Sequence, residues 1–335
     1  MLTILTGLPG SGKTHALLEA IRCRAEAGLK SILLVPESAS HQYERRLLEH
    51  CGNPAGRYAT VSTFSKLTDD LLEEAGLAPE ALDAGGRMLM LYRALEESAS
   101  ALTYYQNARR PQLLARLLDT VQELKACAVD PAQLLQATEE QQGKLRDLAI
   151  LYAAYCRLCQ SGRMDPADRI CLAAEQICNS KLLQDTAVFV DDFDGFTGNK
   201  FPLLAGLLHC CCEMTVSLLL GDDVQLYKQQ YRTKEKLIRL AQNEGAPVQV
   251  KACVESNHAN RPFQRMAKDL YHYQAEADPV QQLSLYTLRD AADECELVAA
   301  LVRQKALQGV RLREMAVVCG DLTEYRDLLK HAFAR

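Results

Sequence analysis

The first residues with an evident chemical capacity form a glycine-rich loop ending in lysine and threonine: Gly7-Leu8-Pro9-Gly10-Ser11-Gly12-Lys13-Thr14. This is the full pattern G-x-x-x-x-G-K-[ST], and it stands after a strand-like run and before a helical pattern, as the motif requires. Its glycines let backbone N–H groups surround a phosphate, and the helix N-terminus adds partial positive charge. We expect Lys13 to reach the β- and γ-phosphates of a nucleoside triphosphate and Thr14 to bind magnesium.

Two consecutive acids, Asp191 and Asp192, follow the apolar run 187–190. An acid at the carboxyl end of a parallel strand is the expected magnesium-side partner of the loop, so Asp191 is predicted to hold the metal through water. Asp192 stands where many ATPases have a glutamate that orients the attacking water, and its shorter side chain predicts weak hydrolysis. The alternative for both acids is a strand end without a metal role.

A third candidate lies in the segment 221–227, Gly-Asp-Asp-Val-Gln-Leu-Tyr, after the next apolar run. A glutamine at this place can contact a γ-phosphate and report its presence to a nucleic-acid groove. Gln225 is therefore a candidate catalytic residue, although the segment taken alone also fits an ordinary turn.

The patterns around these motifs predict an α/β protein with a parallel sheet, because short strand-like runs alternate with helical ones. The strand-like runs are 2–6, 31–35, 59–62, 187–191, 214–220 and 248–252. From about residue 65 to 181 helical periodicity dominates without a fixed repeat, which predicts an all-helical insertion. Tyr43, Leu47 and Leu48 are expected on the inside of the helix that follows the second run.

We expect three parts in the chain, with Pro279 near the last boundary. A RecA-like P-loop lobe takes 1–65 plus 182–278, the helical insertion takes 66–181, and the start of a second α/β lobe takes 279–335. In that lobe, strands are predicted at 282–287 and 315–319 around a helix at 293–305. The lobe is too short to close by itself, so we expect it to be truncated.

Composition and charge exclude some classes of protein. No apolar run reaches the roughly 18 residues of a membrane span, and the first apolar residues lead into the glycine loop, so a cytoplasmic protein without membrane contact is expected. The thirteen cysteines should then be reduced structural thiols, including Cys156 and Cys159, which lie in a helical stretch. The net charge of −5 does not indicate a nucleic-acid binder, and the basic run 228–239 also fits a solvated helix face.

The three motifs, in this order and with a helical insertion between the first two, resemble superfamily 1 helicases of the UvrD type. Several further segments narrow the resemblance to the amino-terminal region of the B subunit of the ATP-dependent helicase/deoxyribonuclease (AddB or RexB type). They read ILLVPES (32–38), YERRL (43–47), VSTFSKL (61–67), VDDFDGFT (190–197) and MAVVC (315–319) followed by Tyr325 and Arg326.

This resemblance implies ATP and magnesium as cofactors and a role in processing double-strand DNA ends for recombinational repair. It implies an A subunit as partner in a heterodimer, and a helicase-like part that tracks single-stranded DNA and recognises a Chi-like sequence without driving unwinding. The family's nuclease domain and iron–sulfur cluster lie in a carboxyl-terminal part that is missing here, so the cysteines of this chain are not assigned to the cluster.

Two departures from active UvrD-type helicases predict feeble turnover. Only six residues precede Gly7, which leaves no room for the adenine-binding glutamine motif. The nearest match to the segment that carries the transition-state arginine is 257–262, Asn-His-Ala-Asn-Arg-Pro, and it is poor. Because such an arginine contributes orders of magnitude in rate, we expect nucleotide binding, at most a weak ATPase, and no motor.

DNA contact is expected from loops at the carboxyl ends of the strands, here Thr63, Phe64, Ser65 and Lys66. Phe64 could stack on a base and Lys66 could contact a phosphate; the alternative places Phe64 in the core. Two other classes stay open. One is a P-loop small-molecule or nucleotide kinase with a helical lid, and the other is an architectural module in which ATP stabilises the fold without turnover.

Overall fold

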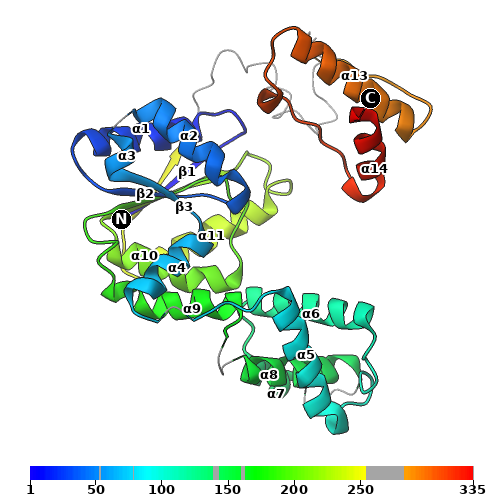
Figure 1. Ribbon diagram of the computed structural model, residues 1–335. Helices are drawn as coiled ribbons and strands as arrows, with labels where there is room; N and C mark the ends of the chain where they lie inside the picture. The colour runs from blue at the N-terminus through cyan, green and yellow to red at the C-terminus, as the bar shows by residue number, and fades with distance from the viewer. Residues whose placement is uncertain (53, 78, 139–142, 160–162, 254–282, 335) are drawn as a thin grey trace. The chain divides into compact units, whose positions relative to one another are not determined.

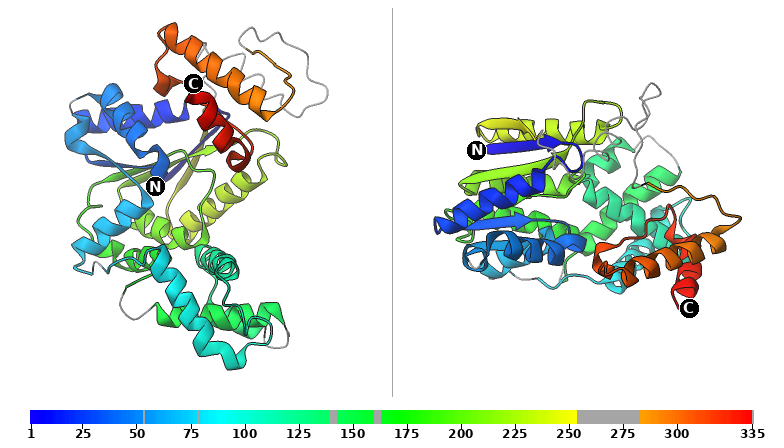
Figure 2. Two further views of the ribbon diagram at one scale, coloured as in Figure 1. Left: turned by 45° about the vertical axis from the view of Figure 1, so that its right-hand side comes forward. Right: turned by 90° about the horizontal axis from the view of Figure 1, so that it is seen from above.

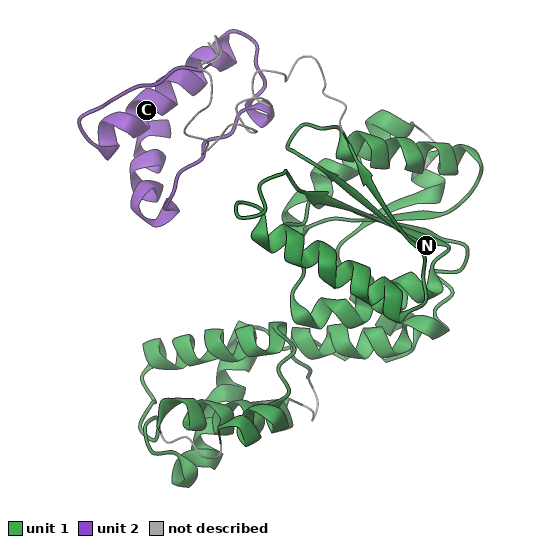
Figure 3. Cartoon of the chain, turned by 180° about the vertical axis from the view of Figure 1, so that it is seen from behind, with its two compact units in different colours: residues 1–274 green, residues 275–335 purple. Residues whose placement is uncertain are grey.

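The computed structural model describes residues 1–52, 54–77, 79–138, 143–159, 163–253 and 283–334, in two compact units, 1–274 and 275–335 (Figure 3). The larger unit holds a six-stranded, all-parallel sheet with helices on both faces (Figure 1). This confirms the predicted α/β class with a parallel sheet of RecA-like type. No described helix has the length and apolar character needed to cross a bilayer.

The sheet has the strand order β3-β2-β4-β5-β1-β6. Its strands are β1 (Leu2–Gly7), β2 (Ser31–Leu34), β3 (Ala59–Ser62), β4 (Ala187–Val190), β5 (Glu213–Leu219) and β6 (Val248–Ala252). Strand β5 lies between β1 and β4, with Leu5 opposite Ser217 and Val190 opposite Val216. The strand that leads into the glycine loop and the strand that ends at the acids are therefore separated by one strand.

Helices cover both faces of the sheet (Figures 1 and 2). One face carries α1 (Lys13–Glu26), α2 (Ser40–Cys51) and the short α3 (Ala55–Tyr58), and the other carries α4 (Phe64–Glu74), α9 (Pro166–Gln176), α10 (Phe201–Cys210) and α11 (Lys228–Asn243). Neighbouring residues of a strand point to opposite faces of the sheet. In β2, Leu33 packs with α1 and α2, whereas Leu34 packs with α4 and α10. The inner strands β1, β2, β4 and β5 are buried on both faces, and this explains why their sequences are largely apolar.

The predicted inside of α2 needs one correction. Tyr43 and Leu47, four residues apart, are buried against the sheet, whereas Leu48 is 55% exposed. Residues at i and i+4 share a helix face, and the next residue turns about 100° away from it. The prediction that Leu48 lies inside was therefore wrong.

The helical region has a core of its own, formed by four helices. They are α5 (Ala84–Ser98), α6 (Pro111–Ala126), α7 (Pro131–Ala137) and α8 (Lys144–Leu158). Proline at the first position of α6 and α7, and the Asp83 and Asp130 side chains that cap α5 and α7, mark where these helices begin. The predicted insertion range 66–181 also contains α9 and most of α4, which pack in the core of the sheet.

The smaller unit contains α13 (Ala291–Leu307) and α14 (Leu322–Phe333). The strands predicted at 282–287 and 315–319 are not formed in its described residues, where 283–288 and 315–319 have no regular structure. A strand needs a hydrogen-bonded neighbour, and the described part of this unit offers neither segment one. Leu285 (94% exposed) and Val318 (91%) accordingly stand in solvent.

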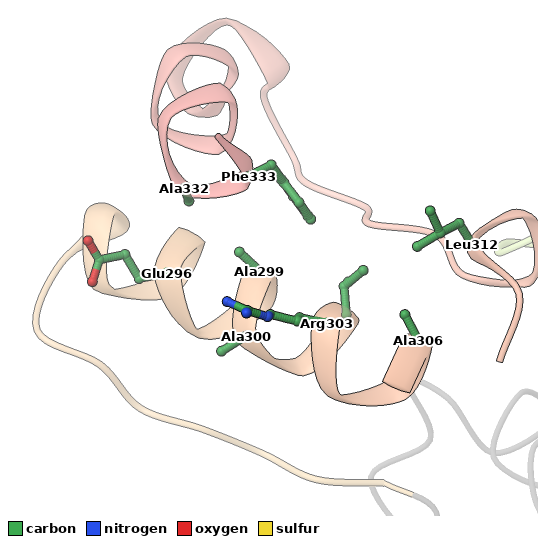
Figure 4. A pocket seen from close by; sticks show the side chains of 9 residues that line it. Glu296, Ala299, Ala300, Arg303, Ala306, Leu312, Ala332 and Phe333 are labelled. Atoms are coloured by element: carbon green, nitrogen blue, oxygen red, sulfur yellow. The ribbon is translucent and has the colours of Figure 1, made fainter. Parts of the chain in front are cut away.

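Within this unit, α13, α14 and the loop around Leu312 enclose a pocket of about 540 Å³. Arg303 of α13 and Phe333 of α14 line the same hollow (Figure 4).

All thirteen cysteines are free thiols, and the described residues contain no group of His, Cys, Asp or Glu arranged to hold a metal ion. Cys159 is buried in the core of the helical region, which raises the pKa of its thiol to about 11.

Candidate functional site

The glycine loop follows β1 and ends where α1 begins at Lys13, as the motif predicts. Gly10 (φ 73°) and Gly12 (φ 87°) adopt left-handed backbone conformations that other residues rarely take. At Gly7, a Cβ atom would lie 2.3 Å from the Ser11 hydroxyl oxygen and 2.8 Å from the Cys253 carbonyl oxygen. The path of the loop therefore requires glycine at these three positions.

Lys13 folds back over this loop. Its Nζ donates hydrogen bonds of 2.9 Å to the carbonyl oxygens of Gly7 and Leu8. Burial lowers the pKa of the Lys13 ammonium, and the negative charge of Asp191 opposes that shift. The cation is thus held at the mouth of the loop, with the acid of β4 close enough to act on it.

Two features of the loop are those expected of a phosphate site. The Ser11 hydroxyl is buried and has no hydrogen-bond partner among the described residues, and a phosphate oxygen would supply the missing acceptor. Helix α1 has Gly12 as its N-cap residue and therefore lacks a side-chain cap. An uncapped helix N-terminus after a glycine loop is a suitable site for an anion.

Asp191 lies at the carboxyl end of β4 and is 3% exposed. Its Oδ2 accepts a 3.0 Å hydrogen bond from the Tyr43 hydroxyl, and its Oδ1 accepts one from the Ser217 hydroxyl. Two hydroxyl donors thus satisfy a buried carboxylate that would otherwise be costly to desolvate. Together with the Thr14 hydroxyl, this carboxylate provides the oxygen donors that magnesium prefers.

Helix α2 supplies residues that the sequence did not indicate as part of the site. Burial, and then the negative charge of nearby Asp191, raises the pKa of the Tyr43 phenol. Arg46 lies 5.5 Å above the Tyr43 ring. The sequence offered one indication that Tyr43 and Ser217 contribute to the site, namely a hydroxyl group at a position that is expected to be buried. Tyr43 lies on the inner face of a helix, and Ser217 lies within an apolar strand.

Asp192 occupies a left-handed conformation (φ 65°) directly after Asp191 and is exposed. Aspartate tolerates this conformation better than most residues. Partial burial, and then the charge of Asp191, raises the pKa of Asp192, while Arg46 opposes the rise. The side chain is placed at the rim of the site, beside the buried acid.

The segment after β5 lies against the glycine loop. A Cβ atom on Gly221 would come within 2.6 Å of the Tyr227 ring and 2.8 Å of the Leu8 side chain. Gln225 itself is exposed, and its backbone N–H donates a 2.8 Å hydrogen bond to Asp223. The structure thus brings the segment to the site, and a contact of Gln225 with a phosphate remains a prediction.

The predicted DNA-contact residues have divided roles. Thr63 caps α4 by accepting a 3.2 Å hydrogen bond from the Lys66 backbone N–H, while Ser65 and Lys66 are exposed. Phe64 is 2% exposed, and the Phe193 ring (5.3 Å) and the Lys200 ammonium (4.8 Å) cover it. The Phe64 ring is therefore not available to stack on a base in this structure, and the core alternative holds. The Phe64 side chain points inward because Phe64 is the first residue of α4 and lies on the face of this helix that packs against the sheet.

Two predictions from the sequence concern residues outside the described ranges. They are the poor match to the segment with the transition-state arginine, at 257–262, and the domain boundary near Pro279.

Comparison with known proteins places the chain in a family. Residues 4–272 match the family described as "ADDB, N-terminal". Over 99% of its length the chain is 27% identical to the B subunit of the ATP-dependent helicase/deoxyribonuclease of Caldanaerobacter subterraneus subsp. tengcongensis, and it is 29% identical to the protein of the same name from Desulforudis audaxviator. The chain spans 31% of the length of these curated relatives. It belongs to the ADDB amino-terminal family.

Proposed function

We propose that this chain is the ATP-binding, helicase-like region of the B subunit of a heterodimeric helicase/deoxyribonuclease that processes DNA double-strand breaks in the cytoplasm. The observation that carries the proposal is the pairing of the glycine loop and Lys13 with a buried, doubly hydrogen-bonded Asp191. The relatives' name, which describes the B subunit of an ATP-dependent helicase/deoxyribonuclease, supports ATP use and a partner subunit.

Each residue of the site has a distinct role in this proposal. Lys13 exchanges its two carbonyl contacts for the β- and γ-phosphates, and loop N–H groups surround the β-phosphate. Thr14 and Asp191 hold the magnesium ion, which neutralises charge on the phosphate oxygens when bound. Asp192 would orient the attacking water, and Gln225 would contact the γ-phosphate and sense the nucleotide.

Turnover should be feeble. The proposed water-orienting residue is Asp192, which is exposed at the rim of the site. Its side chain is shorter than that of the glutamate that many ATPases have at this place, so it would reach less far toward the γ-phosphate. We therefore propose a weak ATPase that serves nucleotide-dependent tracking of single-stranded DNA and recognition of a Chi-like sequence, and not unwinding. An iron–sulfur cluster is proposed only for the nuclease part of the longer relatives.

The proposed DNA path runs over the carboxyl ends of the strands. Ser65 and Lys66 stand exposed there after β3, and Lys66 can contact a phosphate. The net charge of −5 opposes DNA binding, so affinity must come from local placement. Single-stranded DNA should bind weakly and be released as salt rises.

A DNA-stimulated ATPase assay tests the proposal, using this chain with and without the A subunit. We expect slow hydrolysis by the chain alone, stimulation by single-stranded DNA in the presence of the A subunit, and no strand separation by the chain in a fluorescence unwinding assay. Phosphate transfer to a small acceptor without any DNA effect would favour the kinase alternative. Nucleotide binding with no turnover under any condition would favour the architectural one.

A further inference from the structure

Helix α2 contributes a phenol to the proposed magnesium site. The Tyr43 hydroxyl donates a 3.0 Å hydrogen bond to Oδ2 of Asp191, one of the two side chains that are proposed to hold magnesium. Tyr43 belongs to α2, and neither the glycine loop nor β4 contains it. A residue from a third element thus contacts the proposed metal site.

Packing fixes the position of this oxygen. Tyr43 is 2% exposed and lies in the same core cluster as Leu17 of α1 and Phe189 of β4. Arg46, one turn further along α2, stands 5.5 Å above the outer side of the ring. The phenol cannot swing away without repacking the face of the sheet that carries α1 and α2, so its hydroxyl is a fixed reference point.

The donor and acceptor chemistry gives this hydrogen bond a direction. A carboxylate has only acceptor atoms, so the Tyr43 hydroxyl donates its proton to Asp191 Oδ2. Ser217 meanwhile fixes the second oxygen of Asp191.

We propose that Tyr43 is a positioning residue of the magnesium site: its hydroxyl donates to Asp191 Oδ2 and so orients this carboxylate before the metal binds. This inference rests on the proposed binding of ATP with magnesium and extends it to a residue of α2. It predicts that loss of the hydroxyl weakens the use of magnesium and leaves the contacts of Lys13 with phosphate intact.

The test is a magnesium titration of a fluorescent, non-hydrolysable ATP analogue bound to the full chain, comparing the parent with Tyr43→Phe. We expect the magnesium concentration at half-maximal binding to rise about threefold to tenfold, as suits the loss of one hydrogen bond. Affinity for the analogue in excess EDTA should stay within about twofold of the parent value, because only the metal-side contact is lost.

Tyr152→Phe is the matched control. Tyr152 is also 2% exposed, and its hydroxyl donates a 2.8 Å hydrogen bond to the Val129 carbonyl oxygen in the helical region. This variant loses a buried phenol hydroxyl far along the chain from the loop, so its magnesium midpoint should equal that of the parent. An equal shift in both variants would show a general effect of stability and would overturn the proposal.

A second substitution tests whether Tyr43 acts through Asp191. In an Asp191→Asn background, Tyr43→Phe should add nothing to the shift of the magnesium midpoint, and additive shifts would contradict the proposed positioning role. Failure of the parent to bind the analogue at saturating magnesium would reject the proposed function itself. Binding by the parent with superimposable titrations of parent and Tyr43→Phe would reject only the role of Tyr43.

Discussion

The glycine loop and residues 63–66, here called the Thr63 segment, occupy equivalent places in the fold but differ in how their polar groups are hydrogen-bonded. Both follow the carboxyl end of a parallel strand and lead into a helix, α1 after β1 and α4 after β3. Helix α1, with Gly12 as its N-cap residue, has no side-chain cap, whereas the Thr63 hydroxyl caps α4. Ser11 has a buried hydroxyl that no described residue partners, whereas Phe64 is covered by other side chains. The first segment has polar groups that need a ligand, and the second is satisfied by the fold.

This difference separates binding from stability. Substitution of Lys13 in the glycine loop should reduce ligand affinity with little effect on the free energy of unfolding. A substitution of a buried or capping group in the Thr63 segment should reduce stability, and only its exposed Lys66 should affect DNA. Each of the following variants tests one side of that division.

The largest effect is expected for Phe64→Ala, because it leaves a cavity in the core beneath α4. The free energy of unfolding should fall by about 3–5 kcal/mol in urea denaturation. Leu48→Ala, at a residue that is 55% exposed, is the control and should stay within about 0.5 kcal/mol of the parent. If Phe64→Ala unfolds like the parent but loses DNA binding, Phe64 is a DNA contact and not a core residue.

A smaller effect is expected for Thr63→Ala, which removes the cap of α4. Loss of an N-cap hydroxyl costs about 1 kcal/mol of stability, and the midpoint of urea denaturation should shift accordingly. Ser65→Ala, at an exposed neighbouring hydroxyl, should cost less. Equal stability of Thr63→Ala and the parent would mean that the 3.2 Å bond to the Lys66 N–H contributes nothing.

The smallest effect concerns Lys66→Ala and single-stranded DNA. If Lys66 makes one phosphate contact, the slope of log affinity against log salt should become shallower by about 0.7, without a change in stability. Lys30→Ala is the control. Lys30 is exposed but directly precedes β2, so it lies at the amino ends of the strands, away from the proposed DNA path. Identical salt slopes for the parent and Lys66→Ala in fluorescence anisotropy would remove this loop from the DNA path and direct attention to the basic residues of α11.

The sequence predicted those features that depend on local backbone and burial. Each strand of the sheet lies within one residue of its predicted range. For the inner strands β1, β2, β4 and β5, burial on both faces leaves a largely apolar run that marks the strand. The loop conformation followed from its glycines. The bonds that Tyr43 and Ser217 make with Asp191 span 148 and 26 residues and depend on β5 lying between β1 and β4, which no local pattern encodes. Phe64 was ambiguous for the same reason, since its covering residues come from the distant segment after β4.

Calorimetric titration of ATP with magnesium into the parent and Lys13→Ala tests most directly whether the glycine loop is a phosphate site. Removing the ammonium should lower affinity at least about tenfold, or roughly 1.4 kcal/mol, because charge-assisted contacts to phosphate are strong. The urea midpoint of the variant should stay close to the parent value. Equal nucleotide affinity of the parent and Lys13→Ala would contradict the assignment of this loop.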